Sequence, residues 1–185
     1  AEVIRRVVYE TEVFKGVVEM ERSNIAERSS KLFPFSGIYS ASKNLIDLEK
    51  NKKIDQHVNL VSLFWDTVGD NMDQWRGVRI GNLSATEVRR DYIHTHVIIL
   101  QALGMAGKDL MSQFPNNWKT KIKNLKKINW LKNNPEWHQR VIVNGRVVKN
   151  SNSIILAANL IKKALGARLS VKEKALESNM KKNGK

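Results

Sequence analysis

The densest group of side chains able to bind a metal or transfer a proton lies near the middle of the chain. It comprises Glu87, Asp91, His94 and His96. On a helix, Glu87, Asp91 and His94 would share one face at i, i+4 and i+7. His96 would point away from His94, because residues two apart lie on opposite sides of a helix. A shared face can supply metal ligands, but a solvated face with ion pairs is commoner and is the interpretation we favour.

No other motif indicates catalysis or a cofactor. The chain has no cysteine, which excludes disulfides, thiolate metal sites and a cysteine nucleophile. Gly104 and Gly107 are not followed by the Lys-Ser/Thr pair of a phosphate-binding loop. No serine nucleophile elbow or catalytic pair of carboxylates stands out. We therefore expect a protein that is not an enzyme and that binds no metal and no cofactor.

The charge distribution is the strongest functional signal. The formal net charge is +14, yet residues 1–115 carry 15 Lys and Arg against 15 Asp and Glu. Residues 116–185 carry 17 against 3, so the whole excess lies there. A one-sided positive field attracts polyanions, of which nucleic acid is the commonest and an anionic membrane the second.

The candidate DNA-binding residues are cations of this basic half, because Lys and Arg bind phosphates by charge and Arg can also contact guanine. Any single lysine has a plainer explanation as part of a solvated face or as a cation near a helix C-terminus. The excess of cations as a group favours polyanion binding. The predicted residues are Lys119, Lys123, Lys126, Lys127, Arg140, Arg146, Lys149, Lys162 and Lys163.

The elements that must position these side chains are mainly α-helical. Apolar residues at helical spacing predict helices up to about residue 15 and over 24–33, 36–48, 55–75, 84–107, 117–130 and 151–165. A polar turn is expected at 51–53 and a loop at 75–83. Residues 17–20 are expected to be extended. We predict a helical bundle with one short β-hairpin near residues 141–148. Residues 1–115 would form a charge-neutral core, and residues 116–185 a basic helix-hairpin-helix region packed against it.

Several local signals support these boundaries. Ser84 with Glu87, and Ser170 with Glu173, have the spacing of capping boxes at helix starts. Asn144-Gly145, between β-branched residues, predicts a type I′ hairpin turn. Ser151 or Ser153 is expected to cap the next helix, and Gly166 to end it in a left-handed conformation.

A few uncharged side chains could either pack in the core or contact a partner. Trp118 lies on an apolar helix face and is expected in the core, whereas Trp137 could stack on a base. For Asn159, packing is favoured over base reading. A protein-docking role would use Trp65, Trp75 or Phe35 of the neutral half.

Several runs of the sequence resemble the DndB family. They are Val18 to Asn24, Arg28-Ser29, Lys31 to Phe33, Ser36 to Ala41, Glu87 to His94, Gln101 to Gly104, Gly145 to Val147 with Lys149, and Asn159 to Gly166. Full-length members are similar to the DGQHR group and carry that motif in an N-terminal domain. No Asp-Gly-Gln-His-Arg run occurs here, so we expect the chain to correspond to the C-terminal portion of a member.

The resemblance implies a role in bacterial systems that replace a phosphate oxygen of DNA by sulfur. It implies a DNA-binding repressor of the modification operon, with its own promoter as partner. The absence of cysteine fits a cytoplasmic location. The alternative is an interaction module of the modification machinery, docking other proteins of the system or a second subunit, without sequence-specific DNA binding of its own. No apolar run approaches the ~18 residues that span a bilayer, so no membrane partner is expected, although the helix at 118–127 could bind an anionic membrane surface.

Overall fold

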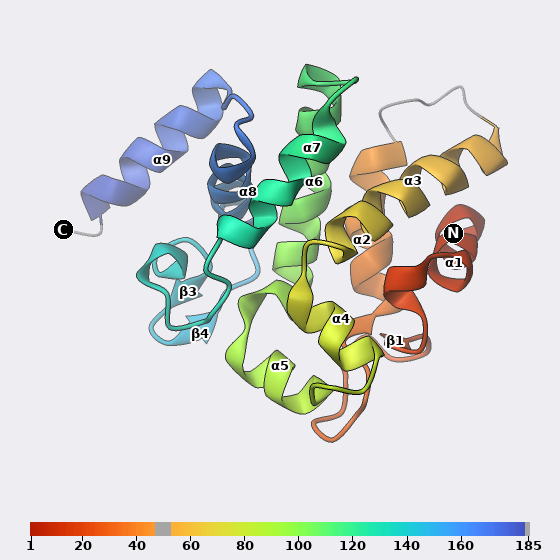
Figure 1. Cartoon of the computed structure of the whole chain (residues 1–185). Coiled ribbons are helices and arrows are strands. Elements are labelled where there is room, and N and C mark those ends of the chain that lie inside the picture. The colour runs from red at the N-terminus through yellow and green to blue at the C-terminus, as the bar shows by residue number, and fades with distance from the viewer. Residues whose placement is uncertain (47–52, 184–185) are drawn as a thin grey trace.

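The computed structural model describes residues 1–46 and 53–183. Over these residues the fold is mainly α-helical, as predicted, with short 3-10 turns between helices (Figure 1). The helices are α1 (Glu2–Glu10), α2 (Phe35–Ile46), α3 (Ile54–Gly69), α4 (Asp73–Arg79), α5 (Ala85–Asp91), α6 (Val97–Gln113), α7 (Trp118–Ile122), α8 (Ser151–Leu165) and α9 (Val171–Asn183). The polar turn expected at Asn51 and Lys52 lies outside the described residues.

The strands are two residues long. β1 (Val18–Glu19) pairs in parallel with β2 (Phe33–Pro34), and β3 (Ile142–Val143) pairs antiparallel with β4 (Arg146–Val147). Asn144 and Gly145 link β3 and β4 with φ angles of 50° and 71°, so the predicted hairpin and its type I′ turn are confirmed.

Helix α6 is the centre of the bundle, with α2 on one side and α8 on the other (Figure 1). It is flanked on both sides, and its residues are therefore apolar around most of the helix. At Gly104 a Cβ atom would collide with the main-chain carbonyl of Ala41, so the glycine allows α2 and α6 to approach closely. The helix predicted over 84–107 ends too early, because α6 continues through Gly104 and Gly107 to Gln113.

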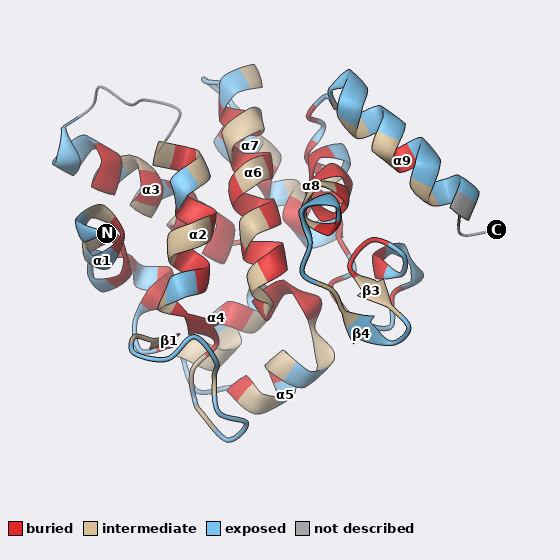
Figure 2. Ribbon diagram, turned by 180° about the vertical axis from the view of Figure 1, so that it is seen from behind, coloured by how far each residue is buried: buried red, intermediate tan, exposed pale blue. Residues whose placement is uncertain are grey.

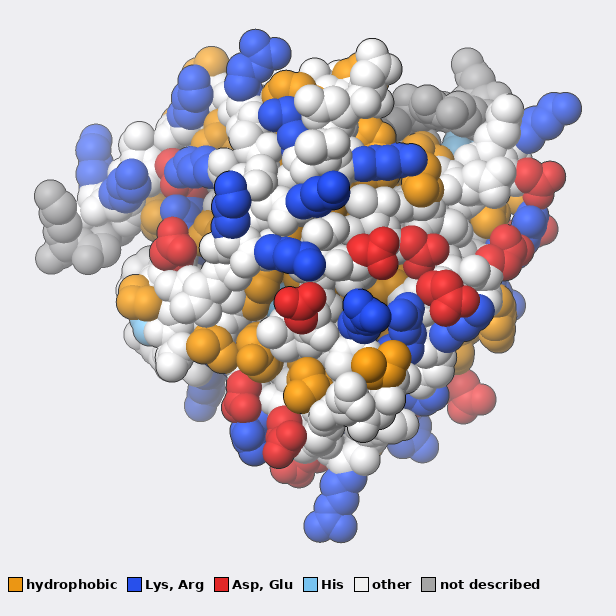
Figure 3. Space-filling view, in the orientation of Figure 1, with side chains coloured by type: hydrophobic (Ala, Val, Ile, Leu, Met, Phe, Trp, Pro, Cys, Tyr) orange, Lys and Arg blue, Asp and Glu red, His pale blue; other side chains and the backbone are white. Residues whose placement is uncertain are grey.

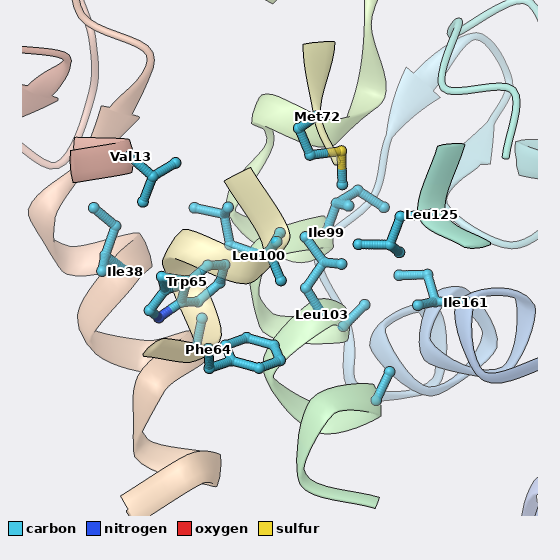
Figure 4. Close-up of a cluster of buried hydrophobic side chains, with 14 of the residues drawn as sticks. Val13, Ile38, Phe64, Trp65, Met72, Ile99, Leu100, Leu103, Leu125 and Ile161 are labelled. Carbon is cyan, nitrogen blue, oxygen red and sulfur yellow. The ribbon is translucent and has the colours of Figure 1, made fainter. Parts of the chain in front are cut away.

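One hydrophobic core takes in residues from both sides of position 115. Phe64 and Trp65 of α3 pack towards Ile99 and Leu103 of α6, and Leu125 and Ile161 of the basic half close the same cluster (Figure 4). Buried residues line the inner faces of α2, α3, α6 and α8, whereas α9 is mostly exposed (Figure 2). The basic half is therefore anchored in the same core as the neutral half.

The helix predicted over 24–33 is wrong. The chain between β1 and β2 has no helix, and Arg89 of α5 holds it in place. Its guanidinium donates to the carbonyl oxygens of Ser29 at 2.8 Å and Glu27 at 2.5 Å. The segment is strongly polar, so a helix here would have almost no apolar face to bury.

Two other predicted helices are split. Residues 70–72 separate α3 from α4, which occupies part of the expected loop at 75–83. Tyr92 is extended and ends α5, and the amide of Ile93 donates to the carbonyl of Trp130 at 2.9 Å. Pairing with the chain near Trp130 replaces the helical hydrogen bonds there, and the helix resumes only at Val97.

The caps of the C-terminal helices are largely as expected. Ser170 and Glu173 form the predicted capping box, with N–O distances of 2.8 and 3.3 Å, and Gly166 ends α8 at a φ of 76°. The N-cap of α8 is Asn150, whose Oδ1 accepts from the amide of Ser153 at 2.9 Å, and neither predicted serine has that role.

Candidate nucleic-acid interface

The first candidate group, Glu87, Asp91 and His94, does not share a helix face, because α5 ends at Asp91. His94 is instead fully buried, and its Nδ1 accepts a hydrogen bond from Nε1 of Trp75 at 3.0 Å. Its Nε2 lies 3.1 Å from Oε1 of Gln74, which assigns the proton to Nε2. Burial lowers the pKa of His94 to about 3, so the ring is a neutral core group.

The basic segment after Pro115 forms α7 and the 3-10 helix η4 (Lys123–Lys127). Trp118, Ile122 and Leu125 turn inward and are buried. The predicted residues Lys119, Lys123, Lys126 and Lys127 are all exposed. We call these four lysines the basic face.

The charge of the basic face is only weakly compensated. The Nζ of Lys126 lies 3.9 Å from a carboxylate oxygen of Asp73. Within 1–46 and 53–183, no carboxylate is within ion-pair distance of Lys119, Lys123 or Lys127. Exposed, unpaired ammonium groups can bind phosphates without first breaking an internal ion pair.

Lys and Arg side chains gather over α7, η4 and α9 in the upper left and centre of Figure 3. The exposed lysines of α9 were missed from the sequence, although the same excess of cations over acids continues to the end of the chain. They are Lys172, Lys174, Lys181 and Lys182.

Two of the predicted DNA-binding residues, Arg140 and Lys162, are buried, and their assignment was wrong. Arg140 pairs with Glu177 of α9, with Nη2 2.9 Å from Oε2, and also donates to the carbonyl of Leu156 at 3.0 Å. Lys162 has no exposed surface and pairs with Asp109 and Glu173. Two acids of the basic half, Glu173 and Glu177, together with Asp109 of α6, thus neutralise buried cations.

Lys163 differs from both the exposed lysines of the basic face and the buried Lys162. Its side chain is about half exposed, but its Nζ lies 2.7 Å from Oε2 of Glu177. Burial alone would raise the pKa of Glu177, but hydrogen bonds from Arg140 and Lys163 outweigh burial and hold it at about 2. Lys163 is therefore committed to this ion-pair network.

The hairpin residues form a second, separate group. Arg146 on β4 and Lys149 after it are both exposed. Lys149 lines a hollow that also includes His96, which precedes the first residue of α6. Burial, with the positive charges of Lys132 and Lys149, lowers the pKa of His96 to about 4.

The remaining candidates have structural roles. Trp137 is fully buried and stacks on Trp130, with ring centroids 5.5 Å apart, so it is not available to a base. Trp118 is in the core, as predicted. Asn159 is buried, and its amide donates to the carbonyl of Glu173 at 3.2 Å, which agrees with the packing role.

The predicted docking residues are mostly unavailable too. Trp65 and Trp75 are buried, which removes them from the protein-docking hypothesis, and Phe35 is partly buried.

The fold and the charge together define a helical protein with an exposed cationic face. The family model described as DndB, DNA-sulfur modification-associated, matches residues 1–168, which is most of the chain. The chain belongs to this family and is thereby associated with DNA sulfur modification. No curated protein and no solved structure matches it. In the part of the chain that the structure describes, no helix is long and apolar enough to cross a membrane.

Proposed function

We propose that this chain is a cytoplasmic DNA-binding regulator that represses the operon of a DNA sulfur modification system. It acts by binding the promoter and has no enzymatic activity of its own. The observation that carries this proposal is the basic face, in which Lys119, Lys123 and Lys127 are exposed and have no carboxylate partner among the described residues. Membership of the DndB family gives the biological context.

The expected binding mode is contact with phosphates from one side of the duplex. Lysines on α7 and η4 provide point charges, and the lysines of α9 extend the positive surface (Figure 3). Contacts of this kind position a protein on DNA, whereas base contacts give specificity. Arg146, exposed at the hairpin, is the predicted residue best suited to a base contact, because arginine can bind guanine in the major groove.

Fluorescence anisotropy with a promoter duplex and a scrambled duplex, over a salt series, tests the proposal. The variant Lys119→Gln/Lys123→Gln/Lys127→Gln should bind more weakly, and the slope of log K against log salt should fall by ~0.9 for each phosphate that is no longer neutralised. The matched control is Arg5→Gln/Lys15→Gln/Lys43→Gln, which removes three exposed charges from α1, the turn after η1 (Glu12–Phe14) and α2.

Preferential binding to the promoter, abolished in the first variant and kept in the control, would support a repressor. Equal weakening in both variants would refute a localised basic face. Equal affinity for the two duplexes would favour the alternative, a module of the modification machinery whose specificity lies in other proteins or in a second subunit.

A further inference from the structure

A hollow of about 160 Å³, lined by both apolar and polar residues, lies between the irregular segment before β2, helix α5, the start of α6 and the chain after β4. None of its lining residues belongs to the basic face, and the lining combines four parts of the chain. Its polar lining residues are Ser23, Asn24, Arg89, Thr95, His96 and Lys149. The lining contains no Asp or Glu.

The charges around the hollow are positive. The guanidinium of Arg89 has no carboxylate partner among the described residues, and its hydrogen bonds go to main-chain carbonyls and to the hydroxyl of Thr86. The Nζ of Lys132 donates to the carbonyl oxygen of Arg89 at 2.8 Å, and its positive charge helps to lower the pKa of His96. Lys149, which follows β4, lines the same hollow as His96 and has no ion pair in the described chain.

The start of α6 adds a further positive contribution. This 17-residue helix begins at Val97, which lines the hollow, and no side chain caps it. The first amides of an uncapped helix point outward and carry the positive end of the helix dipole.

The side chain of Thr95 adds a hydroxyl group to the lining of the hollow. Thr95 is 5% exposed and lines the hollow, and its hydroxyl has no hydrogen bond to any described residue. Among the described residues, Oδ1 of Asn159 is the only fully buried polar side-chain atom without a hydrogen-bond partner, so the Thr95 hydroxyl remains accessible to solvent from the hollow. It can therefore donate to a ligand oxygen bound there.

We propose that this hollow is a binding site for one phosphate group. Lys149 would supply the charge, the start of α6 and Thr95 would donate hydrogen bonds, and Asn24 and Ser23 would complete the polar wall. At ~30 Å³ per water, the volume equals that of about five water molecules, which accommodates the five heavy atoms of a phosphate. The group can come from a DNA backbone or from a free phosphate compound, and the site does not depend on DNA binding by the basic face.

The direct test is an NMR titration of the full chain with inorganic phosphate, with chloride at equal ionic strength as reference. The ring resonances of His96, assigned by comparison with His96→Gln, report on the hollow. Phosphate should shift them in a saturable way that chloride does not reproduce. The same shift with both salts, or no shift, would overturn the proposal.

Two variants localise the site. Lys149→Gln should weaken phosphate binding about tenfold, the usual effect of removing a charge-assisted hydrogen bond. Thr95→Val keeps the shape of the side chain but removes the hydroxyl, and should weaken binding about fivefold. Lys43→Gln, which removes an exposed charge from α2, should leave the phosphate affinity unchanged. Unchanged affinity in Lys149→Gln, with the fold intact, would overturn the assignment.

A short DNA duplex distinguishes the two sources of phosphate. If the duplex shifts the His96 resonances and inorganic phosphate competes, the hollow holds a backbone phosphate. If the duplex binds without affecting His96, while inorganic phosphate still shifts it, the ligand is a free phosphate compound. A duplex that does not bind at all would refute the proposed regulator but not the phosphate site, because the titration with inorganic phosphate is independent of it.

Discussion

Arg140 and Glu177 face each other as a two-pronged ion pair, in which each Nη of the guanidinium contacts one oxygen of the carboxylate. Both side chains are nearly buried, with 11% and 7% of their surface exposed. Glu177 is a buried residue of α9, a helix that is otherwise mostly exposed and that follows the part matched by the family model. Ion pairs from Glu173 and Glu177 therefore fasten α9 to the rest of the molecule.

Glu177→Gln should destabilise the protein by about 3 kcal/mol, because it leaves the guanidinium of Arg140 buried without its counter-charge. Urea unfolding measures the change. The control is Glu136→Gln, which removes an exposed acid of the basic half and should cost less than about 0.5 kcal/mol. Equal stability of the two variants would show that the pair does not hold α9.

Lys162 and Lys123 should respond in opposite ways to the same substitution. Lys162→Gln removes a buried cation paired with Asp109 and Glu173, so it should cost about 3 kcal/mol of stability and leave the DNA affinity of the folded protein unchanged. Lys123→Gln should leave stability unchanged, weaken DNA binding and reduce the salt slope by ~0.9. Urea unfolding and anisotropy, run on both variants, make the comparison. Weaker DNA binding by folded Lys162→Gln would reinstate Lys162 in the interface.

Stability should fall on acidification before the carboxylates titrate. The pKa of His94 is about 3 and that of His96 about 4 in the folded protein, against ~6.5 in an unfolded chain. As the pH falls, the unfolded state therefore binds protons before the folded state does. The stability contributed by the two neutral rings is fully present above about pH 6.5 and is lost towards pH 4. The loss is up to ~1.4 kcal/mol per pH unit for each ring. Urea unfolding at several pH values measures the slope.

His94→Gln should reduce that slope by about half, whatever its effect on stability at pH 7. The slope is the informative quantity, because removal of the hydrogen bond from Trp75 will itself destabilise the variant. An unchanged slope would mean that His94 is not a neutral buried group in the folded protein.

The close approach of α2 and α6 is also testable. Gly104→Ala places a methyl group against the main-chain carbonyl of Ala41, which cannot move without shifting α2, and should cost about 2 kcal/mol despite the better helix propensity of alanine. Gly37→Ala meets the end of the Val97 side chain at 2.9 Å, which can rotate, and should cost less. Thermal unfolding of the two variants makes the comparison. The reverse order would show that the approach to Ala41 is not what requires glycine at 104.

Most signals carried by adjacent residues were read correctly from the sequence, although the N-cap of α8 is Asn150 and not Ser151 or Ser153. The turn at Asn144-Gly145, the end of α8 at Gly166 and the capping box of Ser170 and Glu173 each depend on local backbone geometry, so each is encoded within a few residues. Trp118 was placed in the core by helical spacing alone.

Features that depend on distant residues were not predictable in the same way. The split between α5 and α6 requires the main chain near Trp130, which pairs with Ile93 across nearly forty positions. The burial of Arg140 and Lys162 requires two glutamates of α9, and those same glutamates were counted in the sequence only as a small offset to the charge. Net charge identifies a basic region, but the exposed part of it is decided by tertiary pairing.

The irregular segment before β2 depends on Arg89 for much of its order. This one guanidinium bonds main-chain oxygens at 26, 27, 29 and 31, a role that needs a planar group with several fixed donors. A lysine at this position would conserve the charge but could not make most of these hydrogen bonds. Ser23 and Asn24, on the wall of the hollow, belong to the same segment. The substitution Arg89→Lys, although it conserves the charge, would thus expose the segment to proteases at Arg22 and Arg28. It would also remove one wall of the hollow.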